Sequence, residues 1–327
     1  MQTSASDKEL KMNNHYDVIV IGAGAAGLTA GIYLSRAKLS TLILNEGTIG
    51  GQMVLTHEIA NYPGIESISG YQLARNMKAQ AQKFGSVIKS NLKITALDLE
   101  NELKQITVNG NDVYTSNAVI IATGGKSRTI GAPGEEVLKG KGISYCATCD
   151  GDFFQDKEII VVGGGNSALE EAVSLTKYAS KVTIVHQFDH FQAFEHYVEE
   201  AKSNSKIDFI MESKIVEFIG DEKLTSVKIQ DIKTGNIEER KIDGVFIFIG
   251  YVPNTEKLEG TIELNKWNEI VVDKNMATNV AGVYAAGDST VKRYRQVTTA
   301  VSDGTIAALS TADYIHNLKK TRQLEPV

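Results

Sequence analysis

The chain contains two cysteines, Cys146 and Cys149, and only two residues separate them. In an intracellular protein this spacing is typical of a redox-active dithiol, in which one thiolate attacks a disulfide and the other resolves the mixed disulfide. Asp150 follows directly and is a candidate acid/base for the departing thiolate. The segment therefore predicts thiol–disulfide exchange with these three catalytic residues; an inert buried pair is the alternative.

Composition excludes several other classes of site and partner. Two cysteines cannot supply a Cys₄ zinc or iron–sulfur site, and the nearest histidines in sequence are only His186, His190 and His196, so we expect no metal site. The formal net charge of −6 argues against a nucleic-acid partner. No apolar run reaches the ~20 residues that span a bilayer. The polar N-terminus lacks an apolar signal core, so we expect a cytoplasmic protein with no membrane partner.

The first apolar segment of the chain is followed by a glycine-rich turn. Residues 16–21 form an apolar run typical of a buried strand, and residues 28–37 have a helical pattern. Between them, Gly22 permits a tight turn, Gly24 lets the backbone approach a pyrophosphate, and Gly27 lets the helix pack closely on the strand. The motif predicts a dinucleotide site at the N-terminus of the helix, where anions are favoured. A glycine turn formed for packing alone is the alternative.

The next predicted strand, residues 41–44, ends at two polar residues. In dinucleotide-binding folds, an acid about 20 residues after the glycines binds the ribose hydroxyls. Glu46 is the better candidate for this role, and Asn45 at the strand end is expected to donate to the same ring. A solvated loop acid is the alternative for Glu46.

The same pattern occurs a second time in the middle of the chain. An apolar strand, residues 158–162, leads into Gly163, Gly165 and Ala168, and another strand covers residues 181–185. Further strands are predicted over residues 118–124, 244–250 and 282–288, and a helix over residues 297–315. The duplication predicts an α/β fold with two Rossmann-like nucleotide-binding domains, the second inserted into the first.

Taken in order, the motifs resemble those of the low-molecular-weight thioredoxin reductase family of flavoproteins. The resemblance runs from about Tyr16 to about Leu318. The matching segments are GAGAAG at 22–27, GGQM at 50–53, NYPG at 61–64, ATGG at 122–125, CATCDG at 146–151, GGGNSALEEA at 163–172, GYVPNTE at 250–256, AAGD at 285–288 and RQV at 295–297. The mid-chain position of the CxxC pair separates this family from glutathione-reductase-like enzymes, which carry their dithiol early in the chain.

The resemblance implies FAD in the first domain, thioredoxin as the disulfide substrate, and a homodimer. It also implies that Cys149 faces the flavin and that Cys146 exchanges with thioredoxin. Asp288 would bond the ribityl chain, and residues 295–297 would lie beside the isoalloxazine ring. The implied FAD-binding residues are Gly22, Gly24, Ala25, Ala26, Gly27, Asn45, Glu46, Gly51, Gln52, Asn61, Ala122, Thr123, Gly124, Gly287, Asp288, Arg295, Gln296 and Val297.

The resemblance also predicts the domain boundaries of a glutathione-reductase-type architecture. Residues 1–14 are expected to be a flexible tail. Residues 15–126 and 253–327 would form a discontinuous FAD-binding domain. Residues 127–252 would form an NAD(P)H-like domain that carries the CxxC dithiol.

The second nucleotide motif departs from the family pattern at the end of its second strand. NADPH-dependent members carry His-Arg-Arg-x-x-x-Arg there, and only His186 is present in this chain. Gln187, Phe188 and Gln192 occupy the three arginine positions. Each charge-assisted bond to a 2′-phosphate contributes about 1.5–3 kcal/mol, so these replacements predict a phosphate site weakened by several orders of magnitude. Asp189 lies about three residues too late for an NAD-type acid, unless a loop brings it back.

This departure resembles a branch of the family, the ferredoxin-dependent flavin thioredoxin reductases. We therefore expect an FAD-dependent thioredoxin reductase that receives electrons from reduced ferredoxin, an acidic protein for which Lys292, Arg293 and Arg295 form a candidate docking cluster. The alternative is an NADH- or NADPH-dependent thioredoxin reductase with an atypical nucleotide site. A non-enzymatic flavin sensor is a third class, and the intact CATCD segment argues against it.

Overall fold

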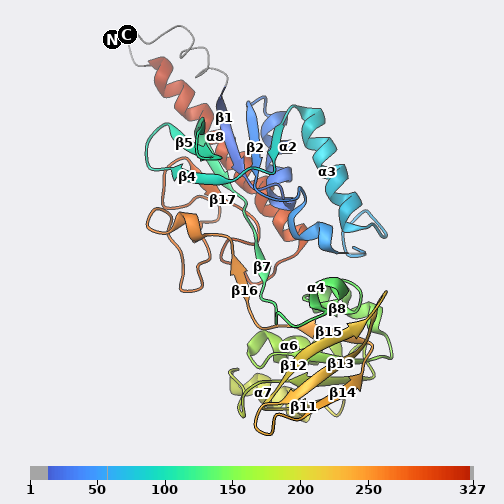
Figure 1. Cartoon of the computed structure of the whole chain (residues 1–327). Helices are drawn as coiled ribbons and strands as arrows, with labels where there is room; N and C mark the ends of the chain where they lie inside the picture. The colour runs from blue at the N-terminus through green and yellow to red at the C-terminus, as the bar shows by residue number, and fades with distance from the viewer. Residues whose placement is uncertain (1–13, 57, 325–327) are drawn as a thin grey trace. The chain divides into compact units, whose positions relative to one another are not determined.

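The computed structural model describes residues 14–56 and 58–324 (Figure 1). The predicted flexible tail, residues 1–14, lies outside the described residues except for Asn14, whose side chain donates to the carbonyl of Val113 at 3.2 Å. Two compact units are present. The first comprises the described residues of 14–58, 62–126 and 252–324, and the second comprises residues 59–61 and 127–251.

A mostly parallel sheet forms the centre of the first unit, with the strand order β3-β2-β1-β6-β5-β4 and with β17 paired to β6. Its strands are β1 (His15–Ile21), β2 (Thr41–Asn45), β3 (Val87–Ser90), β4 (Ile94–Asp98), β5 (Lys104–Val108), β6 (Asp112–Ile121) and β17 (Val283–Ala285). Ile21 is in register with Leu44 on one side and with Ile121 on the other. The carboxyl ends of β1, β2 and β6 therefore meet at one edge of the sheet, where ligands bind in folds of this kind.

The helices of the first unit are α2 (Ala25–Arg36), α3 (Gly70–Phe84) and α8 (Val297–Leu324), with short 3₁₀ turns η1 (Gly51–Leu55) and η3 (Glu256–Leu258). Helix α2 packs against both α3 and α8 (Figure 1). It begins at Ala25, three residues earlier than predicted, because the turn is complete at Gly24. Helix α8 continues past the predicted end at residue 315 to Leu324, in a segment without glycine or proline to stop it.

The second unit is built on a parallel sheet with the strand order β11-β10-β9-β15-β8. Its strands are β8 (Ile143–Ser144), β9 (Glu158–Val162), β10 (Lys181–Val185), β11 (Ile207–Ile210) and β15 (Gly244–Ile247); its helices are α4 (Glu135–Leu138), α5 (Ala147–Asp150), η2 (Gly151–Phe154), α6 (Asn166–Leu175) and α7 (Glu195–Ser203). An antiparallel sheet of β12 (Ser213–Gly220), β13 (Leu224–Asp231) and β14 (Ile237–Lys241) completes the unit.

Alternation along β9 explains the layers of this unit. Ile159 and Val161 pack in a core with residues of α6 and α7, while Ile160 and Val162 pack in a second core with residues of β12 and β13. Successive side chains of a strand point to opposite faces, so a continuously apolar strand is covered on both sides. The short strands β7 (Gly125–Ser127) and β16 (Tyr251–Pro253) pair as a separate two-stranded sheet.

The predicted strands are present, and three of them, β6, β15 and β17, end three residues earlier than expected. β6 ends at Ile121 rather than at residue 124, and β15 ends at Ile247 rather than at residue 250. Gly124 and Gly250 both have positive φ values, of 59° and 120°, which turn the chain out of the strand. No helix in the described part of the chain is both long and apolar enough to cross a membrane.

Candidate active site and nucleotide-binding turns

The first glycine turn joins β1 to α2. Gly22 has a φ of +107°, and a Cβ there would lie 2.2 Å from the carbonyl oxygen of Ala122. A Cβ on Gly27 would lie 1.9 Å from the carbonyl oxygen of Gly22, so both positions require glycine. At Gly24, in contrast, a Cβ would meet no atom within 4 Å. The turn is tightly packed on its strand side and open at Gly24, which fits the close approach of a pyrophosphate.

Asn45, at the end of β2, is hydrogen-bonded to this turn. Its Oδ1 accepts a hydrogen bond from the amide of Ala23 at 2.9 Å, and its Nδ2 donates to the carbonyl of Gly47. Asn45 is also buried. Its side chain therefore holds the glycine turn in shape, a role that the sequence alone does not reveal.

Glu46 lies beside Asn45 and is half-exposed. Its Oε1 accepts a hydrogen bond from the amide of Ile94 at 2.8 Å and pairs with Nζ of Lys257 at 2.8 Å. Both contacts use Oε1, and the described residues give Oε2 no hydrogen bond. The second oxygen is thus available to a ribose hydroxyl, which fits the predicted role of Glu46.

Unpaired buried oxygens lie where the chain leaves β6 and β17. Thr123 Oγ1, Asp288 Oδ1 and Ser289 Oγ have no hydrogen-bond partner among the described residues. Burial raises the pKa of Asp288, and the nearby cations Lys292 and Arg295 lower it in part. Buried polar groups are nearly always hydrogen-bonded, so these oxygens indicate a polar ligand rich in hydroxyl and amide donors, as FAD is. Ser289 is the member of this group that the sequence did not identify.

The other predicted FAD residues of the first unit lie around the same sheet edge. The amide of Gly50 donates to the carbonyl of Ala23 at 2.7 Å, which ties the start of η1, with Gly51 and Gln52, to the first glycine turn. Ala25 and Ala26 begin α2, Ala122 and Gly124 follow β6, and Gly287 follows β17. Asn61 differs from these, because the segment 59–61 groups with the second unit.

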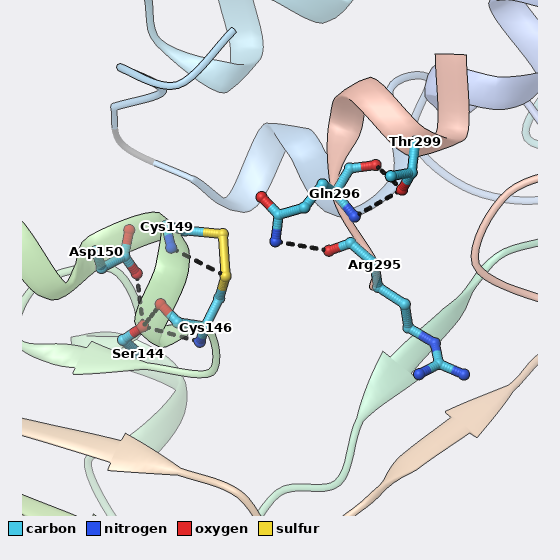
Figure 2. The surroundings of a disulfide bond; sticks show 7 residues. All are labelled: Ser144, Cys146, Cys149, Asp150, Arg295, Gln296 and Thr299. Carbon is cyan, nitrogen blue, oxygen red and sulfur yellow. Dashed lines mark hydrogen bonds between the residues drawn. A yellow bond between two sulfur atoms is a disulfide. The ribbon is translucent and has the colours of Figure 1, made fainter. Parts of the chain in front are cut away.

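Arg295 and Gln296 precede α8, which starts at Val297. Arg295 pairs with Glu269, and its Nε contacts the carbonyl oxygen of Asp288 at 3.4 Å. The amide of Gln296 donates to Oγ1 of Thr299 at 3.1 Å (Figure 2). These contacts fix the backbone of the segment that the resemblance places beside a flavin ring.

Cys146 and Cys149 form a disulfide at the start of the short helix α5 (Figure 2). The backbone amide of Cys149 donates to Sγ of Cys146 at 3.2 Å. Both residues are partly exposed. An N–H group that points at a sulfur stabilises its thiolate after reduction, so the contact favours Cys146 as the reactive thiolate.

Asp150, the third predicted catalytic residue, is partly buried beside this disulfide. Burial is the main reason why the pKa of Asp150 is raised, and the negative charge of Asp152 adds to the effect. The hydroxyl of Ser144 donates to Oδ2 of Asp150 at 2.6 Å and opposes the rise (Figure 2). A carboxyl with a raised pKa is suited to proton transfer near neutral pH.

A second polar cluster, which no sequence motif predicted, anchors the chain just before the cysteines. The buried carboxylate of Glu135 accepts hydrogen bonds from the amides of Ile130 and Gly131, at 3.0 and 2.7 Å. It also accepts a hydrogen bond from the hydroxyl of Tyr145 at 2.6 Å. Because Tyr145 precedes Cys146, this cluster holds the segment that leads into the dithiol.

The second glycine turn has nearly the same backbone geometry as the first. Gly163 has a φ of +136°, and a Cβ there would lie 2.3 Å from the carbonyl oxygen of Phe248. A Cβ on Gly165 would meet no atom within 4 Å. The turn therefore keeps the open central position of a dinucleotide site.

The side chains that follow β10 differ in kind from those near the first glycine turn. His186 is buried, its ring lies about 2.4 Å from where a Cβ on Gly164 would stand, and it stacks on Phe191. Burial lowers the pKa of His186 and so favours the neutral ring. Phe188 is exposed, and Oδ1 of Asp189 lies 2.6 Å from Nδ1 of His190. Neutral and aromatic side chains thus occupy the positions where arginines would contact a 2′-phosphate.

The predicted basic docking cluster is not a free basic surface. Lys292 pairs with Asp303, and both side chains are largely buried, at 12% and 14% exposure. Arg295 is likewise paired with Glu269. The expectation that these residues attract an acidic partner is therefore wrong for two of the three, because adjacent carboxylates neutralise them.

Comparisons with known proteins agree with this geometry. The family described as pyridine nucleotide-disulphide oxidoreductase matches residues 16–304. The thioredoxin reductase of Peptoclostridium acidaminophilum is 45% identical over 311 residues, covering 93% of this chain and 98% of the relative. The "34.2 kDa protein in rubredoxin operon" of Clostridium pasteurianum is 45% identical over 306 residues, covering 94% and 99%.

A solved structure gives the same result for the fold. The crystal structure of thioredoxin reductase from Streptococcus pyogenes is similar with a TM-score of 0.90 and 40% identity, covering 93% of this chain and 99% of that one. The α/β fold with Rossmann-like domains is therefore confirmed. Proteins of this family are FAD flavoproteins, in agreement with the expected cofactor. The chain belongs to the pyridine nucleotide-disulphide oxidoreductases and, among them, to the low-molecular-weight thioredoxin reductases.

Proposed function

We propose that this protein is an FAD-dependent thioredoxin-disulfide reductase that receives its electrons from reduced ferredoxin. The observation that carries the disulfide chemistry is the Cys146–Cys149 disulfide, with an amide donor on one sulfur and the partly buried carboxyl of Asp150 beside it. Family membership supports thioredoxin as the substrate. We extend the proposal to a homodimer, which the family resemblance implies and analytical ultracentrifugation tests.

In the proposed reaction, two electrons and two protons first convert the Cys146–Cys149 disulfide to a dithiol. The Cys146 thiolate then attacks the thioredoxin disulfide, which forms a mixed disulfide and releases one thioredoxin thiolate. Cys149 attacks Cys146 Sγ, which re-forms the disulfide and releases the second thioredoxin thiolate. Asp150 donates the proton that a departing thiolate takes up. Thioredoxin leaves as a dithiol, so electrons and protons balance.

FAD, when bound, accepts electrons one at a time and passes them on as a pair. The residues that fit it are the first glycine turn, Oε2 of Glu46 and the unpaired oxygens of Thr123 and Asp288. Their work is to bind and orient the cofactor: open backbone amides for the phosphates, and acceptors for the sugar and ribityl hydroxyls.

The choice of ferredoxin rests on the side chains after β10. Gln187, Phe188 and Gln192 offer no positive charge to a 2′-phosphate. Without those charges, NADPH loses the contacts that give it tight binding in related enzymes. A one-electron protein donor needs no such site. Because Lys292 and Arg295 are neutralised, the proposal does not depend on them for docking.

An NADH- or NADPH-dependent thioredoxin reductase is the second candidate, and one observation favours it. Gly165 leaves open the space that a pyrophosphate occupies in dinucleotide-binding turns.

Anaerobic stopped-flow mixing distinguishes the two donors. The oxidised holoprotein is mixed in turn with reduced ferredoxin, NADPH and NADH, and reduction is followed by loss of the visible flavin absorbance. We expect fast reduction by ferredoxin alone. Fast reduction by either nucleotide at micromolar concentration contradicts the ferredoxin proposal and supports the second candidate.

The dithiol is tested separately from the donor. Cys146→Ser and Cys149→Ser should each abolish thioredoxin reduction, while reduction of the flavin by the donor continues. Ser213→Ala, a substitution at a buried serine of the same unit, is the control. Turnover of thioredoxin by Cys146→Ser would show that the exchange mechanism is wrong.

A further inference from the structure

Ser144 lies at the end of β8 and is almost completely buried, at 5% exposure. Its hydroxyl contacts both the dithiol segment and Asp150, the residues predicted to be catalytic. Oγ accepts a hydrogen bond from the backbone amide of Cys146 at 3.1 Å and lies 2.6 Å from Oδ2 of Asp150 (Figure 2). One side chain thus contacts both the dithiol segment and the carboxyl group.

The hydroxyl of Ser144 has a single proton and two possible acceptors. The carboxylate of Asp150 is 2.6 Å away, whereas the carbonyl oxygen of Cys146 is 3.3 Å away. The shorter distance and the charge of a carboxylate both favour donation to Asp150. The resulting chain of donors runs from the Cys146 amide through the Ser144 hydroxyl to the Asp150 carboxylate.

We propose that Ser144 is a positioning residue for the thioredoxin reductase reaction, which holds the Asp150 carboxyl at the dithiol and favours its ionised form. The inference rests on the acid/base role proposed for Asp150. Ser144 touches neither substrate nor cofactor in this proposal and acts through Asp150 alone.

The charges around Asp150 make this hydroxyl important. Burial and the charge of Asp152, on η2, both raise the pKa of Asp150, and among the described residues the Ser144 hydroxyl is the one group that lowers it. Helix α6, which packs against α5, carries Glu171, whose own pKa is raised by burial. Tyr178 packs against Gly151, the residue after Asp150. Neither Glu171 nor Tyr178 supplies a positive charge, so no described side chain replaces the Ser144 hydroxyl if it is removed.

The test compares Ser144→Ala with two other serine variants. Ser144→Ala removes the donor, and Ser144→Thr keeps a hydroxyl at the same carbon. Ser213→Ala is the matched control: Ser213 is also buried in the second unit, and its Oγ donates to the carbonyl of Met211 at 2.9 Å, away from Asp150. Each FAD-loaded variant is reduced anaerobically with dithionite and mixed with oxidised thioredoxin across a range of pH.

In Ser144→Ala we expect the limb of the pH–rate profile that depends on Asp150 to move to higher pH. At a pH on this limb the rate should change on the order of tenfold, because a hydrogen bond to a charged group contributes about 1.5 kcal/mol or more. Ser144→Thr should return the limb toward its original position, and Ser213→Ala should leave it unchanged. Carboxyl titration by NMR, with ¹³C-labelled aspartate, should show the same upward movement for Asp150 alone.

An unmoved limb and an unmoved Asp150 titration in Ser144→Ala would overturn the inference. An equal movement in Ser213→Ala would also overturn it, since the effect would then follow from a general loosening of the unit. Asp150→Asn separates this inference from the proposed function. An unchanged pH profile in Asp150→Asn contradicts the acid/base role of Asp150, whereas the hold of Ser144 on that carboxyl is reported independently by the NMR titration.

Discussion

The two glycine turns share their backbone and differ in their side chains. In both, the first glycine has a positive φ and lies against a carbonyl oxygen, Ala122 for one and Phe248 for the other. In both, the central glycine faces open space. The residues at the end of the following strand are polar and acidic in the first unit, Asn45 and Glu46, but a buried histidine and neutral residues in the second.

The difference teaches that a glycine turn and a nucleotide site are separate properties. The first glycine of each turn, Gly22 or Gly163, is required by its positive φ and by the packing of the turn on a carbonyl oxygen, whether or not a ligand binds. What a turn binds depends on the few side chains that surround it. The first turn has an open carboxylate oxygen and lies near unpaired buried oxygens, whereas the second lies beside the buried ring of His186, which stacks on Phe191.

The most direct way to make the second turn bind a nucleotide is to introduce arginines at the three positions after β10 where the family pattern has them. The triple substitution Gln187→Arg, Phe188→Arg and Gln192→Arg supplies three donors for a 2′-phosphate. At about 1.5–3 kcal/mol for each charge-assisted bond, even one or two well-placed arginines should tighten NADPH binding by about 10- to 1,000-fold or more. Isothermal titration with NADPH measures this gain.

NADH serves as the control ligand for the triple variant, because it lacks the 2′-phosphate and should gain little. Equal gains for both nucleotides would indicate a general electrostatic effect rather than a restored phosphate site. Unchanged affinity for both nucleotides would show that the residues around the second turn block nucleotide binding for reasons besides charge.

A smaller and more symmetrical test adds one methyl group to each turn. Gly24→Ala and Gly165→Ala both place a Cβ in open space at negative φ, so neither should strain the fold. If only the first turn holds a dinucleotide, Gly24→Ala should weaken FAD retention by roughly 10- to 100-fold, the effect of 1–3 kcal/mol of overpacking. Gly165→Ala should leave thioredoxin reduction by ferredoxin unchanged.

The measurement is flavin content after dialysis, together with turnover at saturating ferredoxin. Loss of turnover in Gly165→Ala, with FAD fully retained, would show that the second turn takes part in the reaction. Full retention of FAD in Gly24→Ala would show that the pyrophosphate does not pass this glycine.

Each turn is also braced by one asparagine, and the two braces should differ in strength. Asn45 accepts the buried amide of Ala23, whereas Asn166 accepts the amide of Phe194 at 2.8 Å in an exposed setting. Asn45→Ala leaves a buried donor unsatisfied and should cost about 1–3 kcal/mol, while Asn166→Ala should cost at most about 1 kcal/mol. Local amide hydrogen exchange at residues 22–28 and 163–169 reports each effect, and equal effects would contradict this account.

The smallest expected difference is in the response to acid. Burial lowers the pKa of His186 below its ordinary value, so the unfolded chain binds more protons than the folded one just below pH 6.5. Stability of the second unit should therefore be complete above pH 6.5 and decline as the pH falls, until His186 is protonated in the folded state too. Asn45, its counterpart in the first unit, does not titrate.

Hydrogen exchange at pH 7.5 and pH 5.5 measures this contrast in the two units of one sample. His186→Gln is the variant that should reduce the acid sensitivity of the second unit. An identical pH dependence in wild type and His186→Gln would assign the response to other groups of the second unit.

The sequence by itself determined the repeated strand–glycine–helix units, the CxxC pair and the family. These features are local: a strand and a helix are recognised by their periodicity, and a glycine turn or a CxxC pair by its spacing within a few residues. The absence of three arginines after β10 is also visible in the sequence, because a single short motif has to be aligned to detect it.

Tertiary structure decided which of these groups are free to act. Asn45 holds the glycine turn by accepting the amide of Ala23. Lys292 and Arg295 are neutralised by Asp303 and Glu269, which lie well outside the cluster in sequence. Likewise, the Ser144 contact with Asp150 depends on the path of the chain between β8 and α5, which brings residues six positions apart within hydrogen-bond distance. Partners, burial and pKa shifts arise from contacts that form only in the folded chain, and no local pattern of residue types specifies them.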